Sequence, residues 1–174
     1  MSKLILPVEA RDHFQGPATA PLTLLEYGDY ECPHCRAAYP IVKKLQKKLG
    51  QKLRFAYRNF PLTTIHEHAE RAAEAAESAG AQSKFWEMHD YLFEHQDALE
   101  DRHLLEYARR LVLDTKRFEQ DFGGRVFLPR VKEDFTSGVR SGVNGTPTFF
   151  INGVRHDLAP SYDELLSALE EAPL

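Results

Sequence analysis

The 174-residue sequence is poor in cysteine, with only Cys32 and Cys35. Two cysteines three positions apart cannot form the set of disulfide bonds that stabilises a small secreted protein. Their function is therefore expected to depend on their chemical reactivity. No apolar run is long enough to span a bilayer, and the first residues lack the pattern of a signal peptide. We therefore expect a cytoplasmic protein without membrane insertion; it would be exported if a leader had been removed before the present start.

Neither sign of charge dominates the sequence. It has 22 Lys and Arg residues against 26 Asp and Glu residues, a formal net charge of -4, and both signs are mixed along the chain. Without a concentrated basic region it does not favour nucleic acid or anionic lipid as a partner. We expect proteins or small thiols instead. Because 43% of the residues are hydrophobic, we also expect one compact domain over residues 1–174.

The first third of the chain predicts a strand, a helix and a second strand. Residues 22–27 form a short β-prone run that ends just before the cysteines, and residues 53–58 alternate as a second strand. Between them, residues 33–49 repeat apolar side chains at helical spacing and stop at Gly50. The pattern therefore places Cys32 and Cys35 where a buried strand passes into an amphipathic helix.

The rest of the chain predicts a helical block followed by a hairpin and a last helix. The block covers residues from about 62 to 140, with helices expected over 66–79, 83–96, 102–113 and 127–139. A strand at 148–151 is followed by Asn152-Gly153, a strong hairpin-turn signal, and a strand at 154–156. The last helix is expected over 161–169, where Ser161 and Glu164 match a capping box.

The sequence Cys32-Pro33-His34-Cys35 carries the candidate chemistry. A cysteine at a helix N-terminus is stabilised as a thiolate by unpaired amides and the helix dipole, and proline suits the first helical position. The spacing lets Cys35 reach Cys32 after a mixed disulfide has formed, so that one thiol attacks and the other resolves. A protonated His34 would favour the thiolate further. The pair itself, as a redox-active disulfide, would then serve as the only cofactor.

A zinc site is an alternative use of the two cysteines. Structural zinc usually takes four ligands, and no second cysteine pair is present. His66 and His68 form the nearest histidine pair, but on the predicted helix residues two apart point in different directions. We therefore predict no metal.

Three segments resemble the DsbA-like family of thioredoxin-fold thiol-disulfide oxidoreductases: residues 26–35, Phe60-Pro61-Leu62 and residues 145–153. The resemblance extends from about residue 16 to 169. It implies an α/β thioredoxin-like fold with a central mixed sheet, a helical insertion over the active site at about 62–140, and disulfide exchange with protein or peptide thiols. Glutathione or a thioredoxin-type protein would be a possible redox partner.

The same resemblance implies roles for individual residues. Cys32 corresponds to an exposed nucleophile, Cys35 to a buried resolving thiol, and Thr146-Pro147 to a substrate-binding loop with a cis peptide bond opposite the disulfide. The Thr146 backbone would pair with an extended substrate in the manner of strand addition. Glu26, six residues before Cys32, corresponds to a buried acid. Burial would raise its pKa, so that it could accept the Cys35 proton through water.

Two other function classes compete with this interpretation. One is a glutathione-linked thioredoxin-fold enzyme of transferase or isomerase type, although such enzymes commonly lack the second cysteine. The other is a zinc-binding or purely structural interaction module. The direction of electron flow is also open, because a dithiol in a reducing cytosol serves a reductase as well as an oxidase or isomerase.

Overall fold

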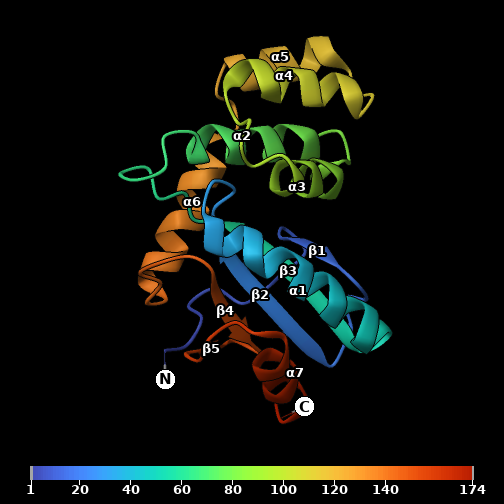
Figure 1. Ribbon diagram of the computed structural model, residues 1–174, viewed down its shortest axis with the longest axis vertical. Coiled ribbons are helices and arrows are strands. Elements are labelled where there is room, and N and C mark those ends of the chain that lie inside the picture. The colour runs from blue at the N-terminus through green and yellow to red at the C-terminus, as the bar shows by residue number, and fades with distance from the viewer. Residues whose placement is uncertain (1, 174) are drawn as a thin grey trace.

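The computed structural model describes residues 2–173 and contains one mixed sheet of five strands (Figure 1). The strand order is β1-β3-β2-β4-β5, in which β2 and β3 are parallel and the other neighbouring pairs are antiparallel. Strands β2 and β3 are the longest, with 7 residues each. The strands are β1 (His13–Gln15), β2 (Leu22–Gly28), β3 (Leu53–Asn59), β4 (Thr148–Ile151) and β5 (Val154–His156).

Residues 2–173 also form seven α-helices, which pack on the sheet or on one another. Figure 1 shows α1 lying along one face of the sheet, while α2 to α5 stack beyond one end of it. Helix α6 runs back from this stack and contacts β3. The helices are α1 (Pro33–Leu49), α2 (Ala69–Gly80), α3 (Phe85–Glu94), α4 (Asp101–Arg110), α5 (Thr115–Gly123), α6 (Leu128–Arg140) and α7 (Tyr162–Glu170), with a 3₁₀ turn at Gly50–Lys52.

The sheet separates two hydrophobic cores, because successive side chains of a strand point to opposite faces. In β2, Leu24 belongs to the larger core, which also contains Cys35 and residues of α1, α3 and α7. Leu25 and Tyr27 belong to the smaller core on the other face, which the N-terminal segment and α6 cover. This alternation also directs Glu26 toward the larger core, on the side of the cysteines.

Most predicted elements agree with the structure to within a few residues. The helix expected over 66–79 is an exception, because it begins only at Ala69. His66 and His68 precede it and bind carboxylates of the segment that leads to α1. Strand β1 and helix α5 were not predicted. A three-residue strand has too few positions to show alternation, and α5 buries only Phe118 and Phe122 in a polar sequence.

Arg58 of β3 holds the N-terminal segment against the smaller core. Its guanidinium is fully buried and forms an ion pair with Asp12, with Nε to Oδ1 at 2.8 Å and Nη2 to Oδ2 at 2.9 Å. The remaining donors bind the carbonyl oxygens of Leu6 and Pro7 and the hydroxyl of Tyr27. All its polar hydrogens are thereby engaged, as a buried arginine requires.

The outer edge of β5 is covered by the start of the chain. Lys3 forms an isolated antiparallel bridge with Val154, and the amide of Arg155 donates to the carbonyl oxygen of Ser2 at 2.9 Å. The amide of Leu4 donates to the carbonyl oxygen of Gly153 at 2.8 Å. The N-terminal residues therefore extend the sheet beyond its last named strand.

Candidate redox site

The two cysteines lie where β2 passes into α1. Strand β2 ends at Gly28, and Cys32 is the N-cap residue of α1, with extended backbone angles and Pro33 following it. The amide of Arg36 donates to the carbonyl oxygen of Cys32 at 3.1 Å, which closes the first helical turn. The predicted position of Cys32 at a helix N-terminus is therefore correct.

The structure brings together residues that are far apart in the sequence. Cys32 Sγ lies 3.5 Å from the carbonyl oxygen of Thr146, to which its thiol form can donate, and the peptide bond between Thr146 and Pro147 is cis. Cys35 Sγ accepts from the amide of Asp29 at 3.4 Å. Both cysteines are free thiols. The site thus consists of the start of α1 and, across from it, the loop that precedes β4.

The two thiols have opposite acidities. The pKa of Cys32 is lowered to about 5, mainly by its hydrogen bond with Cys35, and further by the Thr146 hydroxyl and the amides of Cys35 and His34. Burial acts against this shift. The pKa of Cys35 is raised well above its ordinary value by burial and by its hydrogen bond with Cys32. At neutral pH, Cys32 is therefore the thiolate and Cys35 the protonated thiol.

The expectation that Cys32 is exposed is wrong for this conformation, in which the residue is 3% exposed and Cys35 is 0% exposed. The helical insertion contacts the backbone at Cys32. Gln96, between α3 and α4, donates through Nε2 to the carbonyl oxygens of Tyr30 and Cys32, both at 2.9 Å. The exposed residues of the motif are instead Pro33 and His34.

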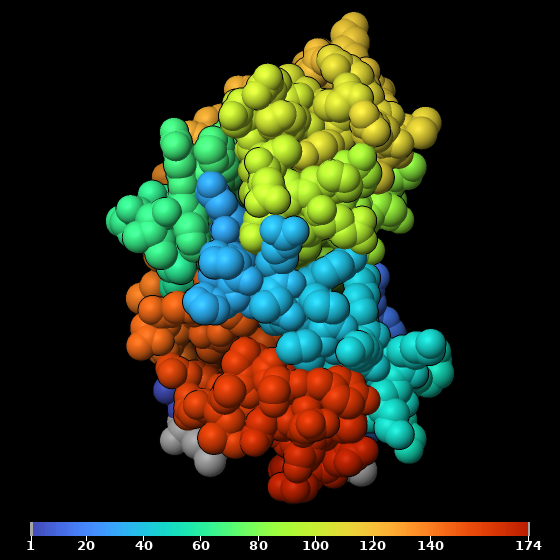
Figure 2. Space-filling model, viewed as in Figure 1, coloured from blue at the N-terminus to red at the C-terminus, as the bar shows by residue number. Residues whose placement is uncertain are grey.

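The surface around this motif is formed by several segments of the chain. In Figure 2 the start of α1, in light blue, lies between the green segment before α2, the yellow-green part of the insertion and the orange segment before β4. A substrate that approaches the cysteines therefore meets both the sheet domain and the insertion.

Glu26 lies in the core behind the cysteines. Its side chain is on the α1 face of β2, the residue is 2% exposed, and within residues 2–173 its Oε1 atom is buried without a hydrogen-bond partner. Burial, and to a smaller extent the negative charge of Cys32, raise the pKa of Glu26 to about 8. A carboxyl group with this pKa can take up and release a proton near neutral pH.

This shift predicts a pH-dependent stability. Because the folded-state pKa of Glu26 exceeds the ordinary 4.5, the folded protein binds this proton more tightly than the unfolded chain. The contribution of Glu26 to the free energy of unfolding should therefore fall as the pH rises from about 4.5 to about 8, while that of Cys32, whose pKa is lowered from 9.0 to about 5, should rise over an overlapping range. Glu26→Gln should remove the Glu26 contribution, so that the free energy of unfolding of the variant exceeds that of the native protein by about 4 kcal/mol at pH 8. Urea unfolding of the reduced protein across this range measures both quantities, and equal slopes for the two proteins would contradict the prediction.

Two carboxylates beside the motif have structural partners that the sequence did not reveal. Asp29 Oδ2 accepts from the amide of Leu62 and pairs with His66 Nδ1, both at 2.8 Å. Glu31 pairs with His68 Nδ1 at 2.9 Å and accepts from the His68 amide. The bond with Glu31 raises the pKa of His68. These contacts hold the segment before Cys32 against the segment before α2.

The structure gives little support to a zinc site. Within residues 2–173, no group of three or more His, Cys, Asp and Glu side chains is placed to hold a metal ion.

In the same part of the chain, no helix combines the length and the apolar character needed to cross a membrane.

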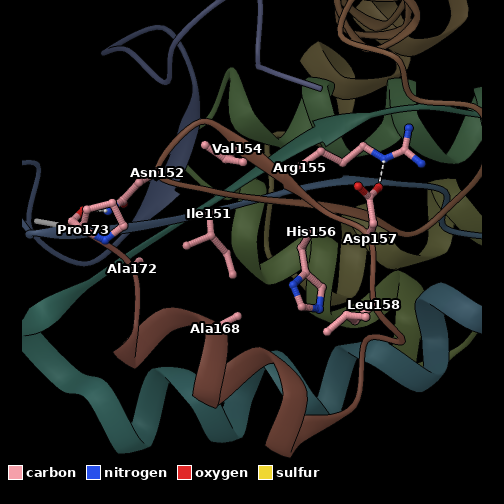
Figure 3. Close-up of a pocket in the computed structure, with 10 residues that line it drawn as sticks. All are labelled: Ile151, Asn152, Val154, Arg155, His156, Asp157, Leu158, Ala168, Ala172 and Pro173. Carbon is pink, nitrogen blue, oxygen red and sulfur yellow. Dashed lines mark hydrogen bonds and ion pairs between the residues drawn. The ribbon is translucent and has the colours of Figure 1, made fainter. Parts of the chain in front are cut away.

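A cavity of about 550 Å³ lies elsewhere, between β5 and α7 (Figure 3). His156 and Leu158 point from the β5 side toward Ala168 of α7, while Arg155 turns away and pairs with Asp157. Neither cysteine lines this cavity. It is therefore separate from the candidate redox site.

The sheet order, the helical insertion and the cysteine pair at the start of α1 define a thioredoxin-fold protein with a DsbA-like architecture. The chain belongs to the thioredoxin family, whose model, described as "Thioredoxin", matches residues 9–171.

Solved structures of similar fold agree with this assignment. BdbD from Bacillus subtilis, in its oxidised form, is 24% identical with a TM-score of 0.81, and the match covers 92% of this chain and 91% of that one. A thioredoxin-like oxidoreductase from Silicibacter pomeroyi is 25% identical with a TM-score of 0.82, covering 93% and 92%. The structure of α-DsbA1 from Wolbachia pipientis is 21% identical with a TM-score of 0.80, and the match covers 97% of this chain and 93% of that one. The predicted α/β fold with a mixed sheet and flanking helices is thereby confirmed.

Curated relatives with higher identity are much longer proteins. The chain is 46% identical over 170 residues to Na(+)/H(+) antiporter NhaA 1 of Salinispora arenicola, covering 97% of this chain and 26% of that protein. It is 47% identical over 166 residues to Na(+)/H(+) antiporter NhaA 3 of Salinispora tropica, covering 95% and 25%. The chain thus spans about a quarter of the length of these relatives.

Proposed function

We propose that the protein exchanges disulfides with protein or peptide thiols, with Cys32 as the nucleophile and Cys35 as the resolving thiol. The observation that carries this proposal is the placement of the pair. Cys32, whose thiol has a lowered pKa, is the N-cap residue of α1, and the buried Cys35 thiol of raised pKa lies next to it. This asymmetry is what sequential attack and resolution require.

The proposed reaction proceeds in two steps. The Cys32 thiolate attacks a substrate disulfide, a Cys32–substrate disulfide forms, and one substrate sulfur leaves as a thiolate. Cys35 then transfers its proton through water to the ionised fraction of Glu26 and attacks Cys32 Sγ, which forms the Cys32–Cys35 disulfide and releases the second substrate sulfur. The substrate gains two electrons and the protein loses them, and the reverse sequence oxidises a substrate dithiol.

The loop before β4 is suited to holding the substrate near Cys32. The carbonyl oxygen of Thr146 lies 3.5 Å from Cys32 Sγ, and Pro147 has no amide hydrogen that could compete for the thiolate. A substrate strand could pair with the Thr146 backbone and place its sulfur at Cys32. Exposed His34, in the first turn of α1, directs its amide toward Cys32 and stays our candidate for tuning the potential.

The curated relatives suggest one class of partner. Proteins named Na(+)/H(+) antiporter NhaA contain a similar segment as about a quarter of their length. This supports an antiporter of this kind as a partner whose thiols the cysteine pair oxidises or reduces. A cytoplasmic location and a glutathione or thioredoxin-type redox partner stay predictions.

Trapping of the mixed disulfide tests the proposal. In Cys35→Ser the first step remains and the second is removed, so disulfide-linked complexes should accumulate on incubation with oxidised protein substrates. Non-reducing gels detect these complexes, and dithiothreitol should dissolve them. The matched control is Cys32→Ser, which keeps one thiol and should trap nothing. Absence of trapped species in both variants would overturn the proposal.

A redox titration separates the remaining function classes. Equilibration with a series of glutathione ratios, followed by alkylation, should show one two-electron transition of Cys32 and Cys35. A potential above the cytosolic poise would indicate an oxidase or isomerase, and a potential near or below it a reductase. Tightly bound zinc without any disulfide would favour the structural module instead.

A further inference from the structure

Helix α3 and the connection that follows it form a row of polar contacts with α1. The contacted residues of α1 are three or four positions apart, so they lie on one face of that helix. In order toward the start of α1, the pairs are Lys43 with Asp90 at 2.8 Å, Tyr39 with Glu94 at 3.1 Å, and Arg36 with Asp97 at 3.6 Å. The row leads to the cysteine motif.

Gln96 continues this row at the start of α1. It is partly buried in the connection between α3 and α4, and its Nε2 atom donates to the carbonyl oxygens of Tyr30 and Cys32, both at 2.9 Å. A side-chain amide nitrogen has two hydrogens, and each is used by one of these carbonyl groups. The opposite orientation of the amide would place its oxygen against two carbonyl oxygens. Gln96 thus binds the backbone of the motif itself.

The two carbonyl groups belong to one tight turn that places Cys32. The amide of Cys32 donates to the carbonyl oxygen of Asp29 at 3.1 Å, which closes this four-residue turn. The Cys32 carbonyl also accepts from the amide of Arg36 at 3.1 Å, so it connects the turn to the first turn of α1. Gln96 therefore holds the second and the fourth residue of the turn at the point where the helix begins.

Tyr30 is bound at its other end by α3 itself. Its hydroxyl lies 3.0 Å from Nδ1 of His89, its ring packs against Phe93 with centroids 4.9 Å apart, and the residue is 1% exposed. The backbone and the side chain of Tyr30 are thus both bound by the same part of the insertion. A movement of this part relative to α1 would be transmitted to the turn before Cys32.

The reactivity of Cys32 depends on this local geometry. Cys32 is the N-cap residue of α1 with extended backbone angles, and the amides of His34 and Cys35 stabilise its thiolate. These donors act only when the helix start has this conformation, because a hydrogen bond weakens steeply as its angle departs from linear. A contact that fixes the N-cap residue therefore also favours the thiolate.

We propose that Gln96 is a positioning residue, which fixes the turn before α1 so that the backbone amides of α1 stabilise the Cys32 thiolate; this deepens the proposed function and rests on it. Gln96 takes no part in bond formation or proton transfer. Because it belongs to the helical insertion, it makes the reactivity of the nucleophile depend on the position of the insertion. A protein that moves the insertion when it binds would change the thiolate fraction of Cys32 and the redox potential of the pair.

Other charged or titratable groups surround the start of α1 and contribute to the pH profile of Cys32. They stay the same in the Gln96 variants described below, so they do not account for a difference from the native protein. They are Glu26 of β2, Asp29 and Glu31 before α1, His34, Cys35 and Arg36 of α1, His66 and His68 before α2, and Asp97 and Glu100 after α3.

The pH dependence of Cys32 alkylation tests this role. Gln96→Met keeps an unbranched side chain of similar length and removes both hydrogen-bond donors. The midpoint of alkylation by iodoacetamide should rise by about one pH unit, slightly less than the loss of one hydrogen bond to a charged group would give. The rate should then be about fivefold lower at the native midpoint of about pH 5 and unchanged at about pH 8.

The redox potential provides a second readout. Destabilising the thiolate about tenfold destabilises the reduced protein by the same factor, so the potential of Gln96→Met in glutathione mixtures should fall by about 30 mV at neutral pH. A residue that only supports packing would not move this value.

Two further variants separate positioning from packing. Gln96→Glu keeps the shape but places a carboxylate against the two carbonyl oxygens, so its midpoint should rise at least as far as that of Gln96→Met. Tyr39→Phe is the matched control, because it removes a contact between α1 and α3 that does not involve the motif. Its midpoint and potential should equal those of the native protein.

A native midpoint and potential in both Gln96 variants overturns the inference. So does equal slowing of Gln96→Met at every pH with an unchanged midpoint, which indicates a packing role. A shift of the same size in Tyr39→Phe also overturns it, because any loosening of α1 would then be sufficient. If the native protein itself shows no reactive thiolate and no two-electron transition, the proposed function fails as well.

Discussion

Replacing Cys32 with serine is expected to lower the rate of disulfide exchange by at least about three orders of magnitude. A serine hydroxyl is not ionised at neutral pH, whereas the Cys32 thiol, with a pKa of about 5, is almost entirely thiolate there. The backbone donors around the sulfur would remain, so the loss would come from the nucleophile itself. Reduction of a fluorescent disulfide-linked peptide measures this rate.

Two further measurements make this prediction specific. The attack rate of the native protein should be nearly constant above about pH 6. It should fall as the pH is lowered further, with a midpoint near the Cys32 pKa of about 5. Cys35→Ser should keep the first attack while losing turnover. A Cys32→Ser protein that retains a substantial fraction of native turnover would assign the nucleophile to another residue.

The second large effect concerns stability and involves the N-terminal segment. Asp12→Asn would leave the fully buried guanidinium of Arg58 without its counter-charge. Removal of one partner of a buried ion pair costs about 3–5 kcal/mol, and we expect a loss in this range. Urea unfolding at neutral pH measures it. The pKa of Asp12 is lowered in the fold, chiefly by Arg58 against the opposing effect of burial, so the same stabilisation should disappear in acid, below its ordinary pKa of 3.8.

An exposed ion pair provides the control for this experiment. Arg11 and Glu133 lie 3.5 Å apart with largely solvated side chains, and Glu133→Gln should change the free energy of unfolding by less than about 0.5 kcal/mol. The double variant Asp12→Leu, Arg58→Met removes both buried charges and should recover part of the loss. If Asp12→Asn were as stable as the native protein, the pair would not hold the segment in place.

The sequence predicted the parts of the site that depend on local pattern. Cys32 and Cys35 are three residues apart, and both the preceding strand and the amphipathic helix have clear periodicity, so their placement at the start of α1 follows. The burial of Glu26 follows from its position in an apolar strand. The mixed sheet and the helical insertion were expected from the family resemblance rather than from periodicity, and the order of the strands was not predicted.

Contacts between distant segments could not be predicted in this way. Gln96 binds a carbonyl oxygen 64 residues away, and His66 pairs with an aspartate 37 residues away. Nothing in the spacing of such residues distinguishes them from ordinary surface side chains. The expected exposure of Cys32 was wrong for the same reason, because Gln96 and Thr146, which both contact Cys32, come from separate parts of the chain.

The backbone pairing of Ser2, Lys3 and Leu4 along β5 has a consequence for self-association. An unpaired outer strand offers a row of free amide and carbonyl groups to which a second molecule can add. Here the first residues occupy much of that row, and the Arg58 anchor keeps the following segment close to the sheet. Loss of these few residues would therefore expose the edge of β5 to pairing with a strand of another molecule. The backbone pairing of Ser2, Lys3 and Leu4 thus protects the protein against aggregation through this edge.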